Sequence, residues 1–315
     1  MKILVLGAAG FIGTNLCQHL CSKKDNYVIA YDHSMSALGR LKNVVSAENI
    51  EYINGKFEMN DDYVALTREV DVVYHLISTV VPGTSNKGIA DEFMSNTVVT
   101  VKLLDACVIS KVKKVIFLSS GGTVYGKIEE VPIKEDTPLN PISSYGIQKI
   151  TIEKLLYLYH YLYQLDYRIV RLANPYGRYQ NPNGIQGVVT TFVYRAIYNE
   201  TVKLYGDGSV VRDYIYIEDA IKAIEQIVCY EGSQKVFNVG TGKGYSVKDI
   251  IEVIERMLHI KMNIDYQPKR AVDVPVNILD ISRYTNEIGE MQYTSLEEGI
   301  LKTKDYILKS QLSEI

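Results

Sequence analysis

The stretch "KILVLGAAGFIG" (residues 2–13) decides the fold of this chain. Its apolar start predicts a buried strand, and the glycines at 7, 10 and 13 lie between that strand and a segment with helical spacing. Gly7 permits a tight turn, Gly10 lets the backbone approach a pyrophosphate, and Gly13 allows close packing of the helix on the strand. The first N–H groups of the helix have no intrahelical partner and favour an anion. The stretch therefore predicts a dinucleotide-binding loop.

Asp32, at the end of the second apolar run, selects the cofactor. It follows Gly13 by 19 residues, close to the separation at which an acidic side chain meets the ribose of a bound dinucleotide. A carboxylate there can accept hydrogen bonds from the ribose hydroxyls and would repel a 2′-phosphate. We therefore expect NAD rather than NADP.

Strand-like and helix-like segments alternate through the first half of the chain. Further apolar runs lie at 26–32, 50–56, 70–78 and 113–120. Continuous apolar strands that alternate with helices are typical of a parallel sheet covered on both faces. We expect an α/β fold with a doubly wound parallel (Rossmann-type) sheet.

The pattern loosens after about residue 175 and predicts a smaller C-terminal α/β lobe. The lobe is expected to begin with a stretch rich in Asn, Pro and Gly at 174–187, whose composition predicts a long loop. A helix is expected at about 188–200, and Ser246 is expected to be the N-cap of a helix that ends near 258.

Composition and charge exclude several classes of protein. With 315 residues, 47% of them hydrophobic, and a formal net charge of −3, the chain has the make-up of a soluble globular protein. It has no long basic run, so we expect no nucleic-acid partner. No segment reaches the roughly 18 continuous apolar residues that span a bilayer, and the first apolar run leads into glycines rather than a signal-peptide cleavage site. We expect a cytoplasmic protein without a membrane span.

The four cysteines predict no metal site. Cys17 and Cys21 are four residues apart on the first expected helix, a spacing that could suit a metal, but no His or second Cys pair completes the set. We expect buried thiols instead.

"SSYGIQKI" (143–150) holds a tyrosine and a lysine that could carry acid–base chemistry. Tyr145 and Lys149 are four residues apart, so on a helix they share one face. A nearby ammonium stabilises a phenolate, which should lower the pKa of Tyr145 from about 10 toward neutrality. The chain has 25 tyrosines, but Tyr145 alone combines this spacing with the upstream glycine loop and the strand end at 117–126. We expect it to be a general acid and base.

These motifs, together with four others, resemble the NAD-dependent sugar-nucleotide epimerase/dehydratase family of the extended short-chain dehydrogenases/reductases, notably UDP-glucose 4-epimerase-like enzymes. The four others are "SSGGTVYG" (119–126), "RLANPYG" (171–177), "LYGDGSVVRDYIYIEDA" (204–220) and "FNVGTG" (237–242). The match runs from residue 1 to about 300. It implies an NAD-binding domain over 1–175 and a lobe over 176–315 that mainly binds a nucleotide sugar, with some of its strands returning to the large domain.

The resemblance implies 4-epimerisation of a UDP-activated hexose or N-acetylhexosamine with NAD that stays bound. Tyr145 would take the proton of the sugar 4-hydroxyl while hydride passes from C4 to the nicotinamide. The 4-keto sugar would then turn and receive the hydride on its other face. Lys149 would tune Tyr145 and bind the nicotinamide ribose.

The resemblance also implies two sets of binding residues. Those expected at the cofactor are Gly7, Gly10, Phe11, Ile12, Gly13, Asp32, Lys56, Phe57, Leu76, Ile77, Ser78, Asn96, Ser119, Tyr145 and Lys149. Those expected at the substrate are Gly121, Thr123, Asn174, Val188, Lys203, Leu204, Tyr205, Arg212, Arg270 and Asp273, of which the two arginines would hold the diphosphate.

The chain departs from the family pattern at three places. Lys56 stands where relatives carry an Asp and cannot accept a hydrogen bond from the adenine amino group. Gly121 stands where many relatives carry a catalytic Ser or Thr, so the missing hydroxyl must come from Ser120, Thr123, a water or the substrate. Thr123, with Gly122 before it, replaces the acid that the dehydratases of the family use, which favours epimerisation over dehydration.

Other activities stay open at this stage. The sugar could be linked to a polyprenyl diphosphate, the enzyme could be an NAD-dependent nucleotide-sugar reductase or dehydrogenase, or the chain could be a catalytically silent NAD-binding regulator. The resemblance also implies a homodimer through helices at about 91–110 and 145–165. The tyrosine-rich face from Tyr157 to Tyr163 fits that interface, or else packs within the monomer.

Overall fold

A seven-stranded parallel sheet forms the centre of the molecule in the computed structural model, which describes residues 1–184, 186–268 and 274–312. The strand order is β10-β6-β5-β4-β1-β2-β3, and every neighbouring pair is parallel. The strands are β1 (Lys2–Leu6), β2 (Tyr27–Asp32), β3 (Ile50–Asn54), β4 (Val72–His75), β5 (Lys114–Ser120), β6 (Asp166–Leu172) and β10 (Val236–Val239). The predicted doubly wound sheet is confirmed, and its first five strands lie within the expected ranges.

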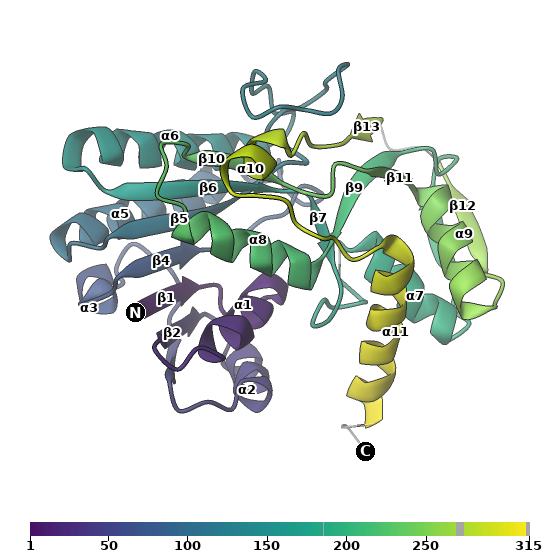
Figure 1. Cartoon of the computed structure of the whole chain (residues 1–315), viewed down its shortest axis with the longest axis horizontal. Helices are drawn as coiled ribbons and strands as arrows, with labels where there is room; N and C mark the ends of the chain where they lie inside the picture. Colours follow the sequence, from purple (N-terminus) through teal and green to yellow (C-terminus); the bar gives the residue numbers. More distant parts are fainter. Residues whose placement is uncertain (185, 269–273, 313–315) are drawn as a thin grey trace.

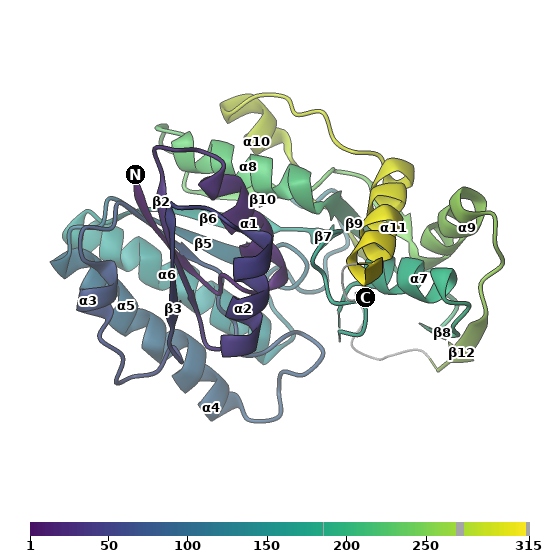
Figure 2. The same cartoon turned by 90° about the horizontal axis from the view of Figure 1, so that it is seen from below.

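Helices cover both faces of this sheet (Figures 1 and 2). One layer contains α1 (Phe11–Cys21), α2 (Met35–Val44) and α8 (Ile217–Cys229), and the other contains α3 (Tyr63–Thr67), α5 (Val99–Ile109) and α6 (Ser144–Tyr163). The side chains of a strand alternate between these layers. Ile3 and Val5 therefore enter one hydrophobic core, whereas Leu4 and Leu6 enter the other. Both faces are buried, which is why these strands read as continuous apolar runs.

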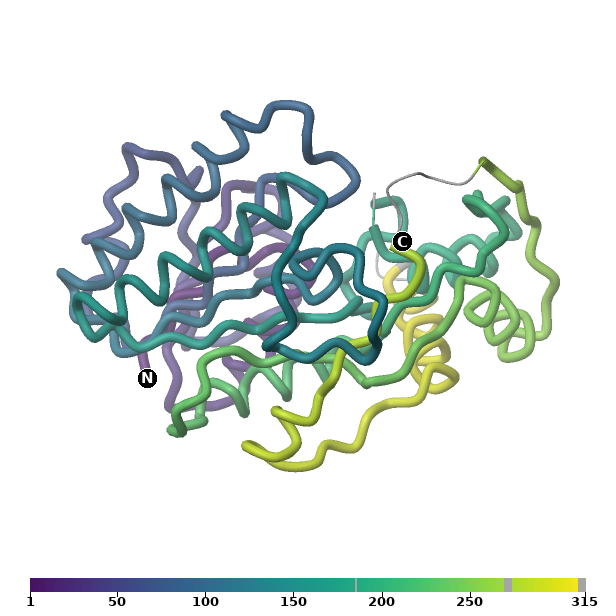
Figure 3. Tube along the Cα trace, turned by 90° about the horizontal axis from the view of Figure 1, so that it is seen from above, coloured from purple at the N-terminus to yellow at the C-terminus, as the bar shows by residue number. Residues whose placement is uncertain are grey.

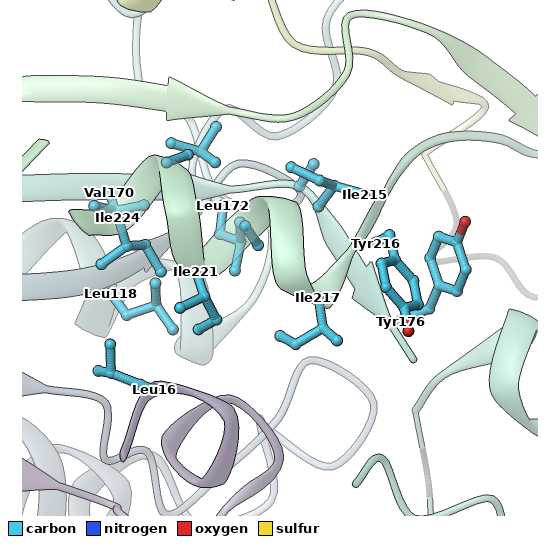
Figure 4. Close-up of a cluster of buried hydrophobic side chains, with 14 of the residues drawn as sticks. Leu16, Leu118, Val170, Leu172, Tyr176, Ile215, Tyr216, Ile217, Ile221 and Ile224 are labelled. Atoms are coloured by element: carbon cyan, nitrogen blue, oxygen red, sulfur yellow. The ribbon is translucent and has the colours of Figure 1, made fainter. Parts of the chain in front are cut away.

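The first core joins the amino-terminal helix to a helix from the second half of the chain. Figure 4 shows Leu16 of α1 and Ile221 and Ile224 of α8 packed over Leu118 of β5 and Val170 of β6. Since α8 and β10 come from beyond residue 175, the second half of the chain completes the large sheet and its cover.

Most of the remaining elements form a smaller lobe beside the sheet (Figure 1). Its strand β9 (Val211–Tyr216) pairs with β7 (Asn174–Tyr176), β11 (Gly244–Ser246) and β13 (Val276–Asn277), while β8 (Val202–Tyr205) pairs with β12 (Ile264–Gln267). The lobe also contains the helices α7 (Val188–Ile197), α9 (Val247–Leu258) and α11 (Leu296–Leu312). Figure 3 shows the N-terminus at the sheet and the last helix, α11, drawn in yellow, in the smaller lobe.

Two expectations about the second half can be compared with this lobe. Ser246 is the N-cap of α9, as predicted, and it also forms a capping box with Asp249. The stretch 174–187 is not wholly a loop, because its first three residues form β7 and pair with β9. Within the described residues, no helix is both long and apolar enough to cross a membrane.

Candidate active site

The glycine loop joins β1 to α1 and leaves the start of that helix open to an anion. The N–H groups of Gly7 and Ala8 both donate to the carbonyl of Tyr31, at 2.9 and 3.1 Å, which ties the loop to β2. A Cβ at Gly13 would lie 2.1 Å from the Gly7 carbonyl oxygen, so a larger residue cannot stand there. Gly10 is the N-cap and offers no side-chain acceptor to the first N–H groups. This cradle fits a pyrophosphate.

Asp32 holds its carboxylate beside the cradle. Oδ2 accepts a hydrogen bond from the Ala9 N–H at 3.0 Å, and Oδ1 accepts one from the Ser34 N–H at 3.2 Å. These bonds fix the carboxylate at the end of β2, next to the glycine loop. The position fits a contact with the ribose hydroxyls of NAD.

The segment after β4, which contains Leu76 to Ser78, lies against the same loop. The Leu76 N–H donates to the Leu6 carbonyl at 3.1 Å, and Ile77 is 3.4 Å from the place of a Cβ on Gly7. Phe11 and Ile12 form the first turn of α1 beside it.

Three residues expected at the cofactor have their side chains engaged elsewhere. The Phe57 ring is buried against Tyr63, with a centroid distance of 5.6 Å. The Ser119 hydroxyl donates to Glu153 at 2.5 Å inside the protein. The Asn96 amide accepts from the Thr79 N–H at 2.8 Å and donates to Thr79 Oγ1 at 2.7 Å. Any cofactor contact of Phe57 or Ser119 would therefore come from the backbone. Lys56 is exposed.

Tyr145 and Lys149 share one face of α6, as predicted. Lys149 is buried, donates from Nζ to the Leu118 carbonyl at 2.9 Å, and lies 5.5 Å from the centroid of the Tyr145 ring. The Tyr145 hydroxyl is hydrogen-bonded to the side chain of Ser120 at the end of β5. The pair thus lies at the carboxyl edge of the parallel sheet, where doubly wound folds bind ligands.

The acidities of the pair differ from the sequence-based expectation. Burial raises the pKa of Tyr145 to about 12, although the bond to Ser120 acts in the opposite direction. Burial lowers the pKa of Lys149 to about 8, opposed by the charge of Glu153. The predicted fall in the pKa of Tyr145 is therefore wrong for the protein alone, because the phenolate loses more hydration than its neighbours replace.

The end of β5 shows why a hydroxyl residue is absent at position 121. A Cβ on Gly121 would lie 2.5 Å from Cδ1 of Leu279, a side chain that is fully buried. Of the two neighbouring hydroxyls, Ser120 is bonded to Tyr145. Oγ1 of Thr123 is buried and has no hydrogen-bond partner among the described residues. Ser120 is thus placed to assist the phenol, and Thr123 is left with a polar atom that a ligand could satisfy.

The substrate residues expected in the lobe lie on several of its elements, among them β7, β9 and α7. Asn174 donates to the Asp213 carbonyl at 3.0 Å, and Arg212 donates to the Val274 carbonyl at 2.7 Å. Val188 is half-buried at the start of α7. Arg270 and Asp273 lie outside the described residues.

Strand β8 corrects one of these assignments. Its side chains alternate, so that Lys203 and Tyr205 are exposed on one face while Leu204 is buried in the core. The side chains of the three residues therefore lie on two faces of the strand, and they could not all line one nucleobase pocket.

Two features of the site were missed from the sequence. Asn277, on β13, is 1% exposed and donates from Nδ2 to the Gly121 carbonyl at 3.1 Å, while its Oδ1 has no partner among the described residues. Glu153 is one turn beyond Lys149 and forms a buried ion pair with Arg171, with a separation of 2.7 Å. The four-residue spacing of Tyr145, Lys149 and Glu153 could have identified the second feature; no motif marks the first.

Comparisons with known proteins agree with this geometry. The model of the NAD dependent epimerase/dehydratase family matches residues 3–240. UDP-glucose 4-epimerase of Mycolicibacterium smegmatis is 34% identical over 97% of this chain and 98% of its own. The dTDP-4-dehydro-6-deoxyglucose reductase of Escherichia coli is 31% identical over 98% and 96%. The crystal structure of UDP-glucose 4-epimerase from Thermotoga maritima with UDP-glucose matches with a TM-score of 0.90 and 32% identity, over 99% of this chain and 100% of that one.

Proposed function

The chain belongs to the NAD-dependent epimerase/dehydratase family, and we propose that it catalyses the 4-epimerisation of a UDP-activated hexose or N-acetylhexosamine with tightly bound NAD. The observation that carries this proposal is the cluster of Ser120, Tyr145 and Lys149 at the sheet edge that also holds the glycine loop. The similarity to UDP-glucose 4-epimerases along nearly the whole chain supports it.

Each residue of the cluster has a distinct task in this proposal. Tyr145 takes the proton of the sugar 4-hydroxyl and later returns one. Ser120 holds the phenol by a hydrogen bond, and Lys149, protonated, supplies a positive charge beside the ring. The glycine loop and Asp32 would hold NAD, which would supply a hydride acceptor and a further positive charge that favours the phenolate. Such neighbours are what can bring a buried phenol into the working range of a general base.

Two neighbouring reactions are less well supported. Sugar 4,6-dehydration lacks its usual acid, because Gly122 and Thr123 precede the "VYG" segment. A nucleotide-sugar reductase is the second candidate, since one relative at 31% identity is a dTDP-4-dehydro-6-deoxyglucose reductase. The two activities differ in cofactor use: an epimerase needs no added NAD, whereas a reductase consumes one cofactor per turnover.

The experiment is to incubate purified protein with UDP-glucose, UDP-N-acetylglucosamine and UDP-glucuronic acid, without added cofactor, and to resolve the epimers. We expect bound NAD in the purified protein and conversion of at least one sugar, with Tyr145→Phe as the inactive control. Conversion that consumes added NAD stoichiometrically would indicate a dehydrogenase, and oxidation of NADH with a 4-keto sugar nucleotide as substrate would indicate the reductase. If NAD is bound and no UDP-sugar is converted, the UDP-sugar form of the proposal is wrong, and polyprenyl-diphosphate-linked sugars become the next substrates to test.

We further propose that two copies of the chain associate through α5 and α6 and that the protein works in the cytoplasm. The location rests on the sequence alone. The association rests on a group of exposed apolar side chains on α6: Ile147, Tyr157, Leu158, Tyr161, Leu162 and Tyr163. Only Tyr159 of the tyrosine-rich segment is buried in the single chain, so packing within the monomer does not account for the others.

A further inference from the structure

Glu92 is a buried carboxylate near the first turn of the helix that carries Tyr145. It lies on α4 (Ile89–Phe93) and is 7% exposed. Across the described ranges, no ion pair joins it to a Lys, Arg or His side chain. A buried carboxylate without a cation is costly unless hydrogen-bond donors surround it.

The donors come from α6 and from the loop before α4. On α6, the Ser144 hydroxyl and the Gln148 amide both donate to Oε2 of Glu92, the amide at 3.2 Å. The backbone N–H groups of residues 86–88 donate to the same carboxylate. The Ser144 bond holds the pKa of Glu92 below its usual value, against the effect of burial. The positive end of the α6 dipole favours a negative charge at this point.

A second set of hydrogen bonds connects Thr79, at the other end of the segment 79–88, to α6. Gln148 accepts a hydrogen bond from Nδ2 of Asn96 at 2.9 Å, and Asn96 accepts one from the Thr79 N–H at 2.8 Å. Ser144 also donates its own N–H to Oδ1 of Asn86 at 2.7 Å. Residues 79–88 are thus tied at both ends to α6, at positions on either side of Tyr145.

We propose that Glu92 is a positioning residue for Tyr145, which holds residues 79–88 and the first turn of α6 as one unit and so fixes the phenol against Ser120. This inference rests on the proposed function, since it assigns Glu92 to the same reaction. Glutamine at position 92 would keep the shape but turn one acceptor into an N–H₂ donor among groups that are donors themselves. Backbone N–H groups cannot reverse their role, so the unit would loosen.

The test compares Glu92→Gln and Ser144→Ala with Asp91→Asn, which changes the exposed neighbouring carboxylate on α4. For both test variants we expect kcat to fall about 10- to 100-fold, the scale of a small misplacement of a catalytic group. KM should stay within about threefold and bound NAD should equal that of the unaltered protein, because the glycine loop is untouched. Asp91→Asn should behave like the unaltered protein. Two test variants are used because one of them could fail to fold.

Amide hydrogen exchange of residues 143–148 gives a second readout that does not depend on turnover. Glu92→Gln should speed exchange there at least about tenfold at an unchanged Tm, as expected for local opening. Unchanged kcat and unchanged exchange in a folded Glu92→Gln protein would overturn the inference, as would a loss of kcat matched by Asp91→Asn. If the unaltered protein converts no UDP-sugar, the proposed function fails, and the exchange data still decide whether Glu92 orders the turn that carries Tyr145.

Discussion

At the level of single residues, Ser120 and Thr123 are the two hydroxyl residues beside Gly121, which stands where many relatives carry a catalytic Ser or Thr. Ser120 is bonded to Tyr145, whereas Thr123 keeps an unsatisfied Oγ1. We expect Ser120→Ala to lower kcat about 10- to 1000-fold, the scale of one donor in a catalytic site. Thr123→Ala should chiefly raise KM, because its free hydroxyl is available to the sugar. Steady-state kinetics of both variants test this, and near-normal kcat in Ser120→Ala would show that Tyr145 and Lys149 need no protein hydroxyl.

We expect the buried charge of Lys149 to lower the stability of the folded protein, although the proposed reaction needs that charge. Its pKa is about 8 in the folded protein against an ordinary value of 10.5. Below pH 8 both states carry the proton and the folded state bears the cost of the buried charge. Between pH 8 and 10.5 the folded state loses its proton first, so stability rises with pH.

Replacing the lysine by an apolar residue removes that cost. We expect Lys149→Met to be inactive yet more stable at pH 7, by at most ~3 kcal/mol. The gain should shrink as the pH rises from 8 to 10.5. Urea unfolding of both proteins at pH 7 and pH 10 measures it. A variant that is less stable at pH 7 would mean that the bond from Lys149 to Leu118 outweighs the burial of charge.

At the scale of elements, the sequence predicts what depends on local pattern and misses what depends on contact. Strands β1 and β5 were found because burial on both faces leaves an unbroken apolar run. Strand β7 was missed because three residues that include a proline carry no such pattern. The orientation of Leu204 was missed because motif matching treats consecutive residues alike, whereas a strand alternates them. That Leu279 fills the space beside Gly121 could not be read from the sequence, because the two residues are far apart in the chain.

Gly121 and Leu279 should therefore be coupled in stability. Gly121→Ser alone places a Cβ against a buried side chain that cannot move away freely, and we expect a loss of about 1–3 kcal/mol from overpacking. Leu279→Ala alone should cost about 2–5 kcal/mol through the cavity it leaves. The double variant should be more stable than the sum of the two losses predicts. Additive losses in urea unfolding would show that the two side chains do not compete for one space.

Gly13 of the glycine loop and Gly39 of α2 form a matched pair of helical glycines. Gly13→Ala would place its Cβ 2.1 Å from a backbone carbonyl, so we expect loss of bound NAD and a lower Tm. Gly39→Ala on α2 meets nothing within 4 Å and should stabilise the protein by about 0.5–1 kcal/mol, with normal NAD content. NAD released by acid from each purified variant is the measurement. Full NAD content in Gly13→Ala would contradict the role assigned to the loop.

At the level of the whole molecule, the two lobes meet at the carboxyl end of β5. Asn277 of β13 reaches Gly121 of β5, and its strand partner is Arg212 of β9. A ligand that moves β9 would therefore act on the backbone beside Ser120.

The outer face of α6 carries several exposed apolar side chains, and we expect it to join two copies of the chain. Tyr161 is 71% exposed, and Leu158 lies one turn before it on the same helix; monomers seldom leave such a patch open to water. Changing both residues to Glu should convert a dimer to a monomer in light scattering at micromolar concentration. Tyr266→Glu on β12, which introduces the same charge at a 65% exposed tyrosine of the other lobe, should leave the mass unchanged. A monomeric parent protein, or a Leu158→Glu/Tyr161→Glu variant that stays dimeric, would exclude this face as the interface.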